Sequence, residues 1–378
     1  MAYEGKYDLA IRDASTLFQE AHNSALRFRA GLLVVNSAAA TRQFVDGLRF
    51  LDKTLQLQPL VSDQNLRHQG LNVAGIFYNQ LGQYEAGRRF AAQVLADRPS
   101  ARNRCLAGQI EMESLTGLGD APATDEAFTG VIDQCSSQGE GVIANLVRAD
   151  LARKWLSQDK TSQAIALLES HLAEIEATRY PRLIGEINSV LAQLHMARAQ
   201  TTLAEANAKA AVAVSSGTAF ALPVVMAYRV LYEISLSRGD FAQALDNYRH
   251  YAEADKAYLN DVKARELAYQ HVRQETLQKN QMIELLEGQN KVLHLEQRVA
   301  KQQTKNTLLF SSLLALLLAS IVYRAYKIKR VQVAFRRLAE TDALTGISNR
   351  HHFGRQAEAV LAICSRSGQD VGMVMFDL

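Results

Sequence analysis

Residues 82–87 read GQYEAG, residues 239–244 read GDFAQA and residues 5–10 read GKYDLA. All three share one pattern, in which a glycine is followed two residues later by an aromatic residue and five residues later by a small one. The glycine lets the chain reverse between two helices, the ring fills the space between them, and the small residue lets the backbones approach. Recurrence of this pattern predicts a row of helical hairpins.

Weaker copies of the pattern fall between these three, and aligning them gives steps of 37 to 42 residues. The aligned small residues are Ala10, Gly47, Gly87, Ala127, Ala164, Ala206 and Ala244. This spacing predicts seven hairpins over residues 1–251, an α-solenoid that resembles the tetratricopeptide repeats although its period exceeds their 34 residues. By analogy with other solenoids we expect a peptide or protein ligand; the alternative is a spacer that binds nothing.

Composition supports a mainly helical chain without a nucleic-acid partner. Hydrophobic residues make up 48% of the 378, and none of the five prolines follows Pro223. A net charge of +3, with no stretch that interleaves basic and aromatic residues, argues against nucleic-acid binding. No C-x-x-C spacing is present, which removes structural zinc and thioredoxin-like sites. Cys105 and Cys135 fall at the start and end of antiparallel neighbours, so we predict a disulfide there in an oxidising compartment.

Residues 252–305 predict a long helical stalk. They hold no proline and one glycine, Gly288, which permits a helix of about 80 Å at 1.5 Å per residue. Leu285, Val292 and Val299 recur every seven residues with Leu295 between them, although Gln281 and Gln302 occupy other seam positions. This spacing predicts a coiled coil and a homodimer. The alternative is a solvated helix that docks back on the repeats.

Residues 306–323 carry no charge and would span about 27 Å as a helix, which predicts a transmembrane segment in a lipid bilayer. Residues 324–338 follow as a basic linker without acids before Glu340, with Arg324, Lys327, Lys329, Arg330, Arg336 and Arg337. Positive charge favours the cytoplasmic side, so the repeats should be periplasmic at a bacterial inner membrane. Residues 1–20 carry charges instead of an apolar export signal, so we expect the true N-terminus further upstream.

Residues 339–353 read AETDALTGISNRHHF. This stretch resembles the opening signature of the GGDEF family, D-x-L-T-G-L-x-N-R-R-x-F, with Ile347 and His351 as departures. The matching residues are Asp342, Leu344, Thr345, Gly346, Asn349, Arg350 and Phe353. The resemblance implies that residues 339–378 are the first helix and strand of a truncated α/β GGDEF domain, the strand being the apolar run from Asp370 onward.

Membership of that family would imply a diguanylate cyclase, which condenses two GTP into cyclic di-GMP as a homodimer of stalks and catalytic domains. Asp377 and Leu378 match the two positions that hold catalytic Mg²⁺ in the family. The remaining catalytic motif would lie beyond Leu378, so this chain should itself be inactive and hold no catalytic residue. Two alternatives stay open: a degenerate GGDEF nucleotide receptor, and a repeat-based protein-binding scaffold without catalysis.

Overall fold

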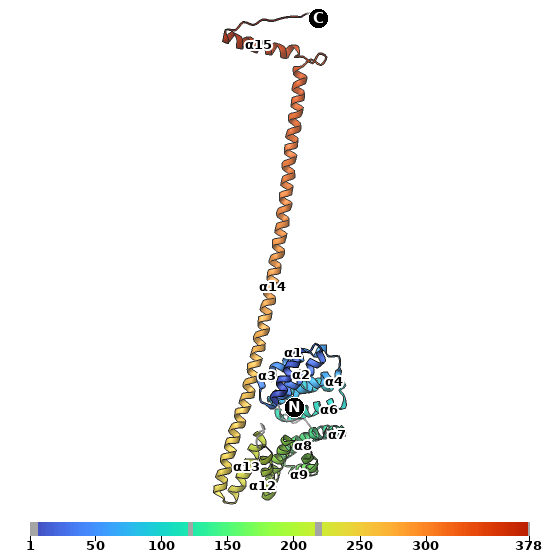
Figure 1. Cartoon of the computed structure of the whole chain (residues 1–378), viewed down its shortest axis with the longest axis vertical. Helices are drawn as coiled ribbons and strands as arrows, with labels where there is room; N and C mark the ends of the chain where they lie inside the picture. The colour runs from blue at the N-terminus through green and yellow to red at the C-terminus, as the bar shows by residue number, and fades with distance from the viewer. Residues whose placement is uncertain (1–6, 120–123, 216–220, 377–378) are drawn as a thin grey trace. The chain divides into compact units, whose positions relative to one another are not determined.

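The computed structural model describes residues 7–119, 124–215 and 221–376, and every regular element in those ranges is a helix (Figure 1). Extended pairing there is limited to one isolated bridge between Thr341 and Ser348. The chain divides into two compact units, Met1–Asn280 and Gln281–Leu378.

Paired antiparallel helices build the first unit. The first members of the pairs are α2 (Ser24–Ala40), α4 (Gln64–Gln80), α6 (Ala101–Leu118), α8 (Gly141–Ser157), α11 (Pro181–Ala197) and α13 (Ala221–Ser237). The second members are α3 (Phe44–Leu55), α5 (Tyr84–Ala96), α7 (Asp125–Ser137), α9 (Thr161–Glu169), α12 (Thr201–Ser215) and α14 (Phe241–Glu340), with α1 (Tyr7–Glu20) preceding them and the short η2 (Gln58–Leu60) and α10 (Leu172–Ala177) in connections. The predicted row of helical hairpins is therefore confirmed.

The turns inside the hairpins explain the repeat pattern and its gaps. Gly82 and Gly239 have φ angles of 74° and 73°, the left-handed conformation in which glycine carries no Cβ penalty. Arg42, Asp159 and Ala199 adopt the same conformation at the equivalent turns, with φ of 61°, 59° and 55°. A search for glycine therefore misses these turns.

The predicted small residues fall at the fourth position of their helix in five of the seven cases. Two assignments were wrong. Because α12 begins at Thr201, its fourth position is Ala204, which is fully buried, and the predicted Ala206 is exposed. In α7 the fourth position holds the buried ring of Phe128, and the predicted Ala127 lies beside it.

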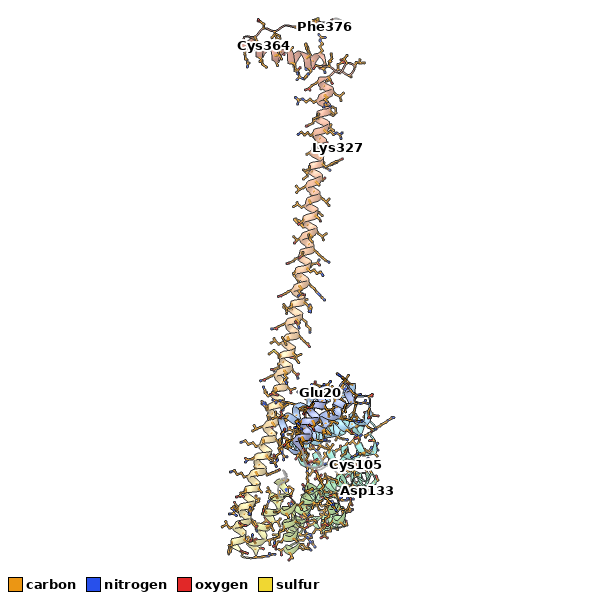
Figure 2. All side chains as sticks on the ribbon, viewed as in Figure 1. Glu20, Cys105, Asp133, Lys327, Cys364 and Phe376 are labelled. Carbon is orange, nitrogen blue, oxygen red and sulfur yellow. A yellow bond between two sulfur atoms is a disulfide. The ribbon has the colours of Figure 1, made fainter. Side chains whose placement is uncertain are left out.

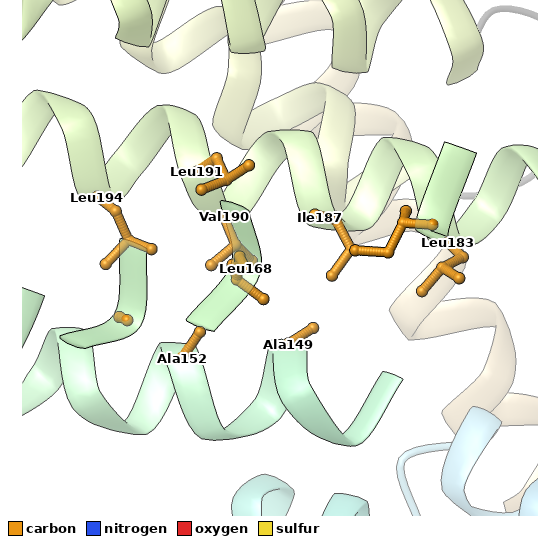
Figure 3. Packing of buried hydrophobic residues seen from close by; sticks show 10 residues of the cluster. Ala149, Ala152, Leu168, Leu183, Ile187, Val190, Leu191 and Leu194 are labelled. Atoms are coloured by element: carbon orange, nitrogen blue, oxygen red, sulfur yellow. The ribbon is translucent and has the colours of Figure 1, made fainter. Parts of the chain in front are cut away.

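Leucine, isoleucine, valine and alanine side chains fill the spaces between neighbouring hairpins. Figure 3 shows one such cluster, in which α11 presents Leu183, Ile187 and Leu194 toward Ala149 and Ala152 of α8. All five are at most 1% exposed. The three- and four-residue spacing along α11 puts its apolar side chains on one stripe, so the stripe faces the preceding hairpin.

The second unit contains the rest of α14 and α15 (Arg350–Ser367), and none of residues 281–376 is buried. Of the helices described, α14 is the one long and apolar enough to cross a membrane, with a mean hydropathy of 2.0 over its most apolar 18 residues and none of them buried.

The predicted α/β portion is wrong for the residues described. Residues 370–376 form no strand. An apolar run becomes a strand by hydrogen bonding to a neighbouring strand, and the described part of the chain offers none. The fold class is all helical across these ranges.

Candidate ligand-binding face and the α14 brace

The N-terminal part of α14 docks back on hairpins that lie about two hundred residues earlier in the chain. We call residues 261–275 the brace. Ala268 is 5% exposed and joins the apolar cluster of α2, α3 and α4. Tyr269 packs edge-on against Tyr78, with ring centroids 6.4 Å apart. The alternative of a helix that docks on the repeats therefore applies to this part of α14.

Asp261 anchors the start of the brace with its side chain 5% exposed. It pairs with Arg265 one turn along and with Arg42, whose Nε lies 3.4 Å from Oδ1. Arg265 also donates a 2.8 Å hydrogen bond to the carbonyl oxygen of Gln80, which is the last residue of α4. A carboxylate this buried is stabilised only when its charge is paired, so this ionic cluster fixes where α14 sits.

Arg49 and Glu275 close the other end of the brace. The guanidinium donates to both carboxylate oxygens, with Nη2 2.8 Å from Oε1 and Nε 3.3 Å from Oε2. The hydrogen bond and then the opposite charge raise the pKa of Arg49, and the same contacts lower the pKa of Glu275. This bidentate geometry makes the pair specific for one docking position.

A second group of polar side chains lies among α5, α6, α8 and α11, and we call Tyr84, Glu113, Asp150, Arg153 and Glu186 the inner polar cluster. Glu113 of α6 accepts hydrogen bonds from Asn79 at 3.2 Å and from Gln109 at 3.0 Å. Burial, followed by the charge of Glu113 and the nearby hydroxyl of Tyr258, raises the pKa of Tyr84. The five members come from α5, α6, α8 and α11, and Tyr258 of α14 lies near them.

Asp150 is the most buried member of the cluster, at 8% exposed. Burial raises its pKa to about 7, against the lowering effect of Arg153 and with a further increase from Glu113. Arg153 Nη1 lies 2.7 Å from Asp150 Oδ1, and Arg153 also pairs with Glu186 of α11. Carboxylates with pKa values shifted this far are enriched at functional sites, although ion-pair networks shift them too.

The structure joins Cys105 of α6 and Cys135 of α7 by a disulfide, with Cα atoms 5.0 Å apart. Both side chains are fully buried against Ala144. Cys364 on α15 is free. Figure 2 labels Cys105 within the array and Cys364 near the other end of the chain.

The residues of the predicted GGDEF signature form a local turn and helix start. Asp342 accepts hydrogen bonds from the backbone of Leu344 at 3.0 Å and Thr345 at 3.1 Å, which lowers its pKa. Gly346 has φ of 69°, and Asn349 caps α15 by accepting from the backbone of His352 at 2.9 Å. Arg350 and Phe353 are exposed in the first turn of α15, and Leu344 is exposed in the preceding turn. These roles are local and structural.

The predicted metal residues, Asp377 and Leu378, lie outside the described residues. Within residues 7–119, 124–215 and 221–376, no group of three or more His, Cys, Asp or Glu side chains is placed to hold a metal ion. The Mg²⁺ site therefore stays a prediction.

No protein-family model matches the chain, and no curated protein matches it. Among solved structures it is similar to NprR in complex with its cognate peptide NprX, at 10% identity over 65% of this chain and 71% of that one, with a TM-score of 0.46. It is also similar to aspartyl phosphate phosphatase F from Bacillus subtilis, at 12% identity over 64% and 72% with a TM-score of 0.43. BtubC (BKLC) from P. vanneervenii follows, at 11% identity over 67% and 92% with a TM-score of 0.34. Likenesses of this strength do not say what this chain binds.

The resemblance to the GGDEF family is wrong, and so is the diguanylate cyclase activity inferred from it. That domain would need a sheet, whereas the described residues form helices and turns without a strand. The signature had matched a short turn followed by a helix cap, a combination that local backbone geometry alone can favour. The predictions of GTP as substrate and cyclic di-GMP as product rested on the same resemblance and are withdrawn with it.

Sequence reasoning gave docking of this helix only as an alternative and named none of the brace contacts, and it missed the inner polar cluster. Asp261 and Arg265 are four residues apart, which is also the spacing of an ordinary pair on a solvated helix. Asp150 is the one acidic residue of α8 and lies between Ala149 and Leu151, and an acid flanked by apolar residues was a usable signal.

Proposed function

We propose that this chain is a membrane-anchored, repeat-based protein-binding scaffold that takes a peptide or protein segment at the inner polar cluster. One observation carries the proposal: a buried carboxylate, Asp150, sits beside Arg153 of its own helix, and Arg153 also pairs with Glu186 of the next repeat. Such a group costs stability that aliphatic side chains would not cost.

The chemistry of the inner polar cluster suits a polypeptide ligand. Glu113 and Asp150 offer acceptors, Arg153 offers donors, and Tyr84 offers a half-buried ring and a hydroxyl. An extended peptide carries donors and acceptors at every residue, so it can satisfy both kinds of group together. Tyr258 of α14 lies near the cluster, because its hydroxyl contributes to the raised pKa of Tyr84.

The proposal includes the orientation of the chain in a bacterial inner membrane. The uncharged residues 306–323 would lie in the bilayer, the basic residues 324–338 on the cytoplasmic side and the array on the periplasmic side. The disulfide between Cys105 and Cys135 supports this orientation, because such bonds persist in oxidising compartments.

Peptide selection against the full chain in lipid nanodiscs tests the binding proposal. We expect selected peptides to bind the wild type and to lose at least about tenfold in affinity with Glu113→Gln or Arg153→Gln, since each removes a hydrogen-bonded charge. Lys209→Ala is the matched control, because its exposed side chain contacts Glu205 on α12 away from the cluster. Peptides that bind all four proteins equally would contradict the proposed site.

Cys364 gives a separate test of the orientation. A membrane-impermeant maleimide applied to cells with a permeabilised outer membrane should label an introduced Ser62→Cys, which is exposed on the array, and should leave Cys364 unlabelled. Detergent should then expose Cys364 to the reagent. Labelling of Cys364 in intact cells, with Ser62→Cys protected, would reverse the assignment.

A further inference from the structure

Beyond the brace, α14 carries a seam of exposed apolar residues at heptad spacing. Leu285, Val292 and Val299 occupy one position of the heptad (a), and Leu295 occupies the other (d). They are 56%, 55%, 57% and 58% exposed. The helix is continuous from Phe241 to Glu340, so these positions keep one phase along it. A stripe of this spacing buries its side chains when a second helix winds around the first.

The residue types along the seam select the number and direction of the helices. Leu295 at a d position between Val292 and Val299 at a positions favours two parallel strands, while the other two d positions hold Gly288 and Gln302. The next a position is Asn306, and one asparagine at such a position fixes register and a two-stranded state. Gly288 occupies a d position and leaves a notch between Leu285 and Val292, so the main contacts should come from the turns that follow it.

Charges beside the seam complement each other in a parallel pair. Lys291 is at the g position and Glu296 is at the e position of the next heptad. In a parallel coiled coil these two positions of opposite helices lie side by side, so Lys291 of each copy meets Glu296 of the other. Both pairs are attractive, and no like charges are opposed at this level.

We propose that residues 285–306 of two copies of this chain pair as a parallel, two-stranded coiled coil. The interface has Val292, Leu295 and Val299 at its centre, Asn306 of both copies at the membrane edge, and Lys291–Glu296 pairs along its sides. Anchoring of both copies in one bilayer would align the helices in parallel and raise their local concentration, which offsets the short length of the seam. The pairing needs the membrane anchor of the proposed function, but it does not depend on peptide binding.

Cysteine cross-linking of the full chain in nanodiscs or native membranes tests the pairing. With Cys364→Ser as the background, Leu295→Cys should form a disulfide-linked dimer at least about tenfold faster than Leu293→Cys, because d positions face each other and b positions face solvent. The two leucines are matched in type, in place and in exposure, at 58% and 54%. Neither side chain belongs to the array core, so neither variant threatens folding.

Charge exchange sharpens the result. Lys291→Glu should slow cross-linking through Leu295→Cys, and adding Glu296→Lys should restore it, because the double variant recovers opposite charges at the same positions. Equal rates at positions 293 and 295, or no dimer at either, would overturn the pairing. Loss of peptide binding in these variants would instead concern the proposed function, because the seam lies outside the inner polar cluster.

Discussion

Residues 7–280 and residues 281–376 use apolar side chains in opposite ways. In the array, leucines such as Leu191 and Leu194 are at most 1% exposed. In the second unit, leucines such as Leu295 and Leu313 are 58% and 62% exposed, and no residue from 281 to 376 is buried. The array therefore buries an apolar core within one chain, whereas the apolar side chains of residues 281–376 are not buried within this chain.

The contrast teaches where each kind of partner acts. The candidate site in the array is polar, so its ligand should be recognised through charges and hydrogen bonds. The seam and the apolar stretch of α14 expose their apolar side chains to solvent. Partners that cover these side chains should therefore be hydrophobic. Under the proposed function, the chain separates ligand recognition from anchoring and pairing.

Leucine truncation in the two units should give the largest difference. Leu191→Ala should lower the free energy of unfolding of the array by about 2 to 5 kcal/mol, because it leaves a cavity in a packed interface. Leu286→Ala, at a position 50% exposed outside the seam, should leave it unchanged. The chain has one tryptophan, Trp155, which packs in the array, so its fluorescence during urea unfolding reports this unit alone. Equal losses of unfolding free energy in the two variants would contradict the contrast between the two units.

Removal of the disulfide should be the next largest effect. Cys105→Ser with Cys135→Ser should cost about 3.5 kcal/mol of array stability if the lost loop closure dominates, given a separation of 30 residues. Cys364→Ser is the control and should cost nothing measurable by Trp155 fluorescence. A stable array with two free thiols at these positions, detected by mass spectrometry, would contradict the predicted bond.

Local pattern was enough to predict the array. The glycine turns at Gly82 and Gly239 and the small residues that follow them fix where helices reverse, and these signals lie within a few residues of each other. The same kind of signal failed at residues 339–353, because a turn and a helix cap can be built without the domain that usually follows them.

Contacts distant in sequence could not be predicted. Arg49 and Glu275 of the brace are 226 residues apart, and the local sequence around neither residue indicates the other as its partner. Asp150 acquires its shifted pKa from helices packed around it, so its role depends on the assembled array. In physical terms, the helices and their spacing could be predicted from local sequence. The candidate site could not, because it forms only when residues of distant helices come together in the folded array.

Asp150 should make array stability depend on pH. Its pKa in the folded state is about 7, above its ordinary value of 3.8, so the stability it contributes is present at low pH and is lost as pH rises toward 7. Between pH 5.5 and 8 the wild type should lose about 2 kcal/mol more than Asp150→Asn, which cannot ionise. Urea unfolding at both pH values measures the difference. Parallel pH profiles for the two proteins would remove Asp150 as a buried titrating group.

The smallest effect concerns two equivalent turns, at Ala199 and Gly239, whose φ angles are 55° and 73°. Each residue donates its amide to a carbonyl three residues earlier, Met196 or Leu236. A Cβ added at Gly239 would meet no atom within 4 Å, so Gly239→Ala changes the backbone preference alone. We expect it to destabilise the α13 hairpin by about 1 kcal/mol, the cost of placing alanine in the left-handed region.

Ala199→Gly removes that same cost but makes the unfolded chain more flexible, so it should stabilise α11 and α12 by at most about 1 kcal/mol. Ala92→Gly, exposed in the middle of α5, is the control and should destabilise by about 1 kcal/mol. Amide hydrogen exchange resolves effects of this size hairpin by hairpin, because opening free energies differ along a repeat array. If Ala199→Gly loosens its hairpin as much as Ala92→Gly does, then the left-handed turn at Ala199 is not a strained copy of the glycine turn, and the forty-residue repeat loses its physical basis at that position.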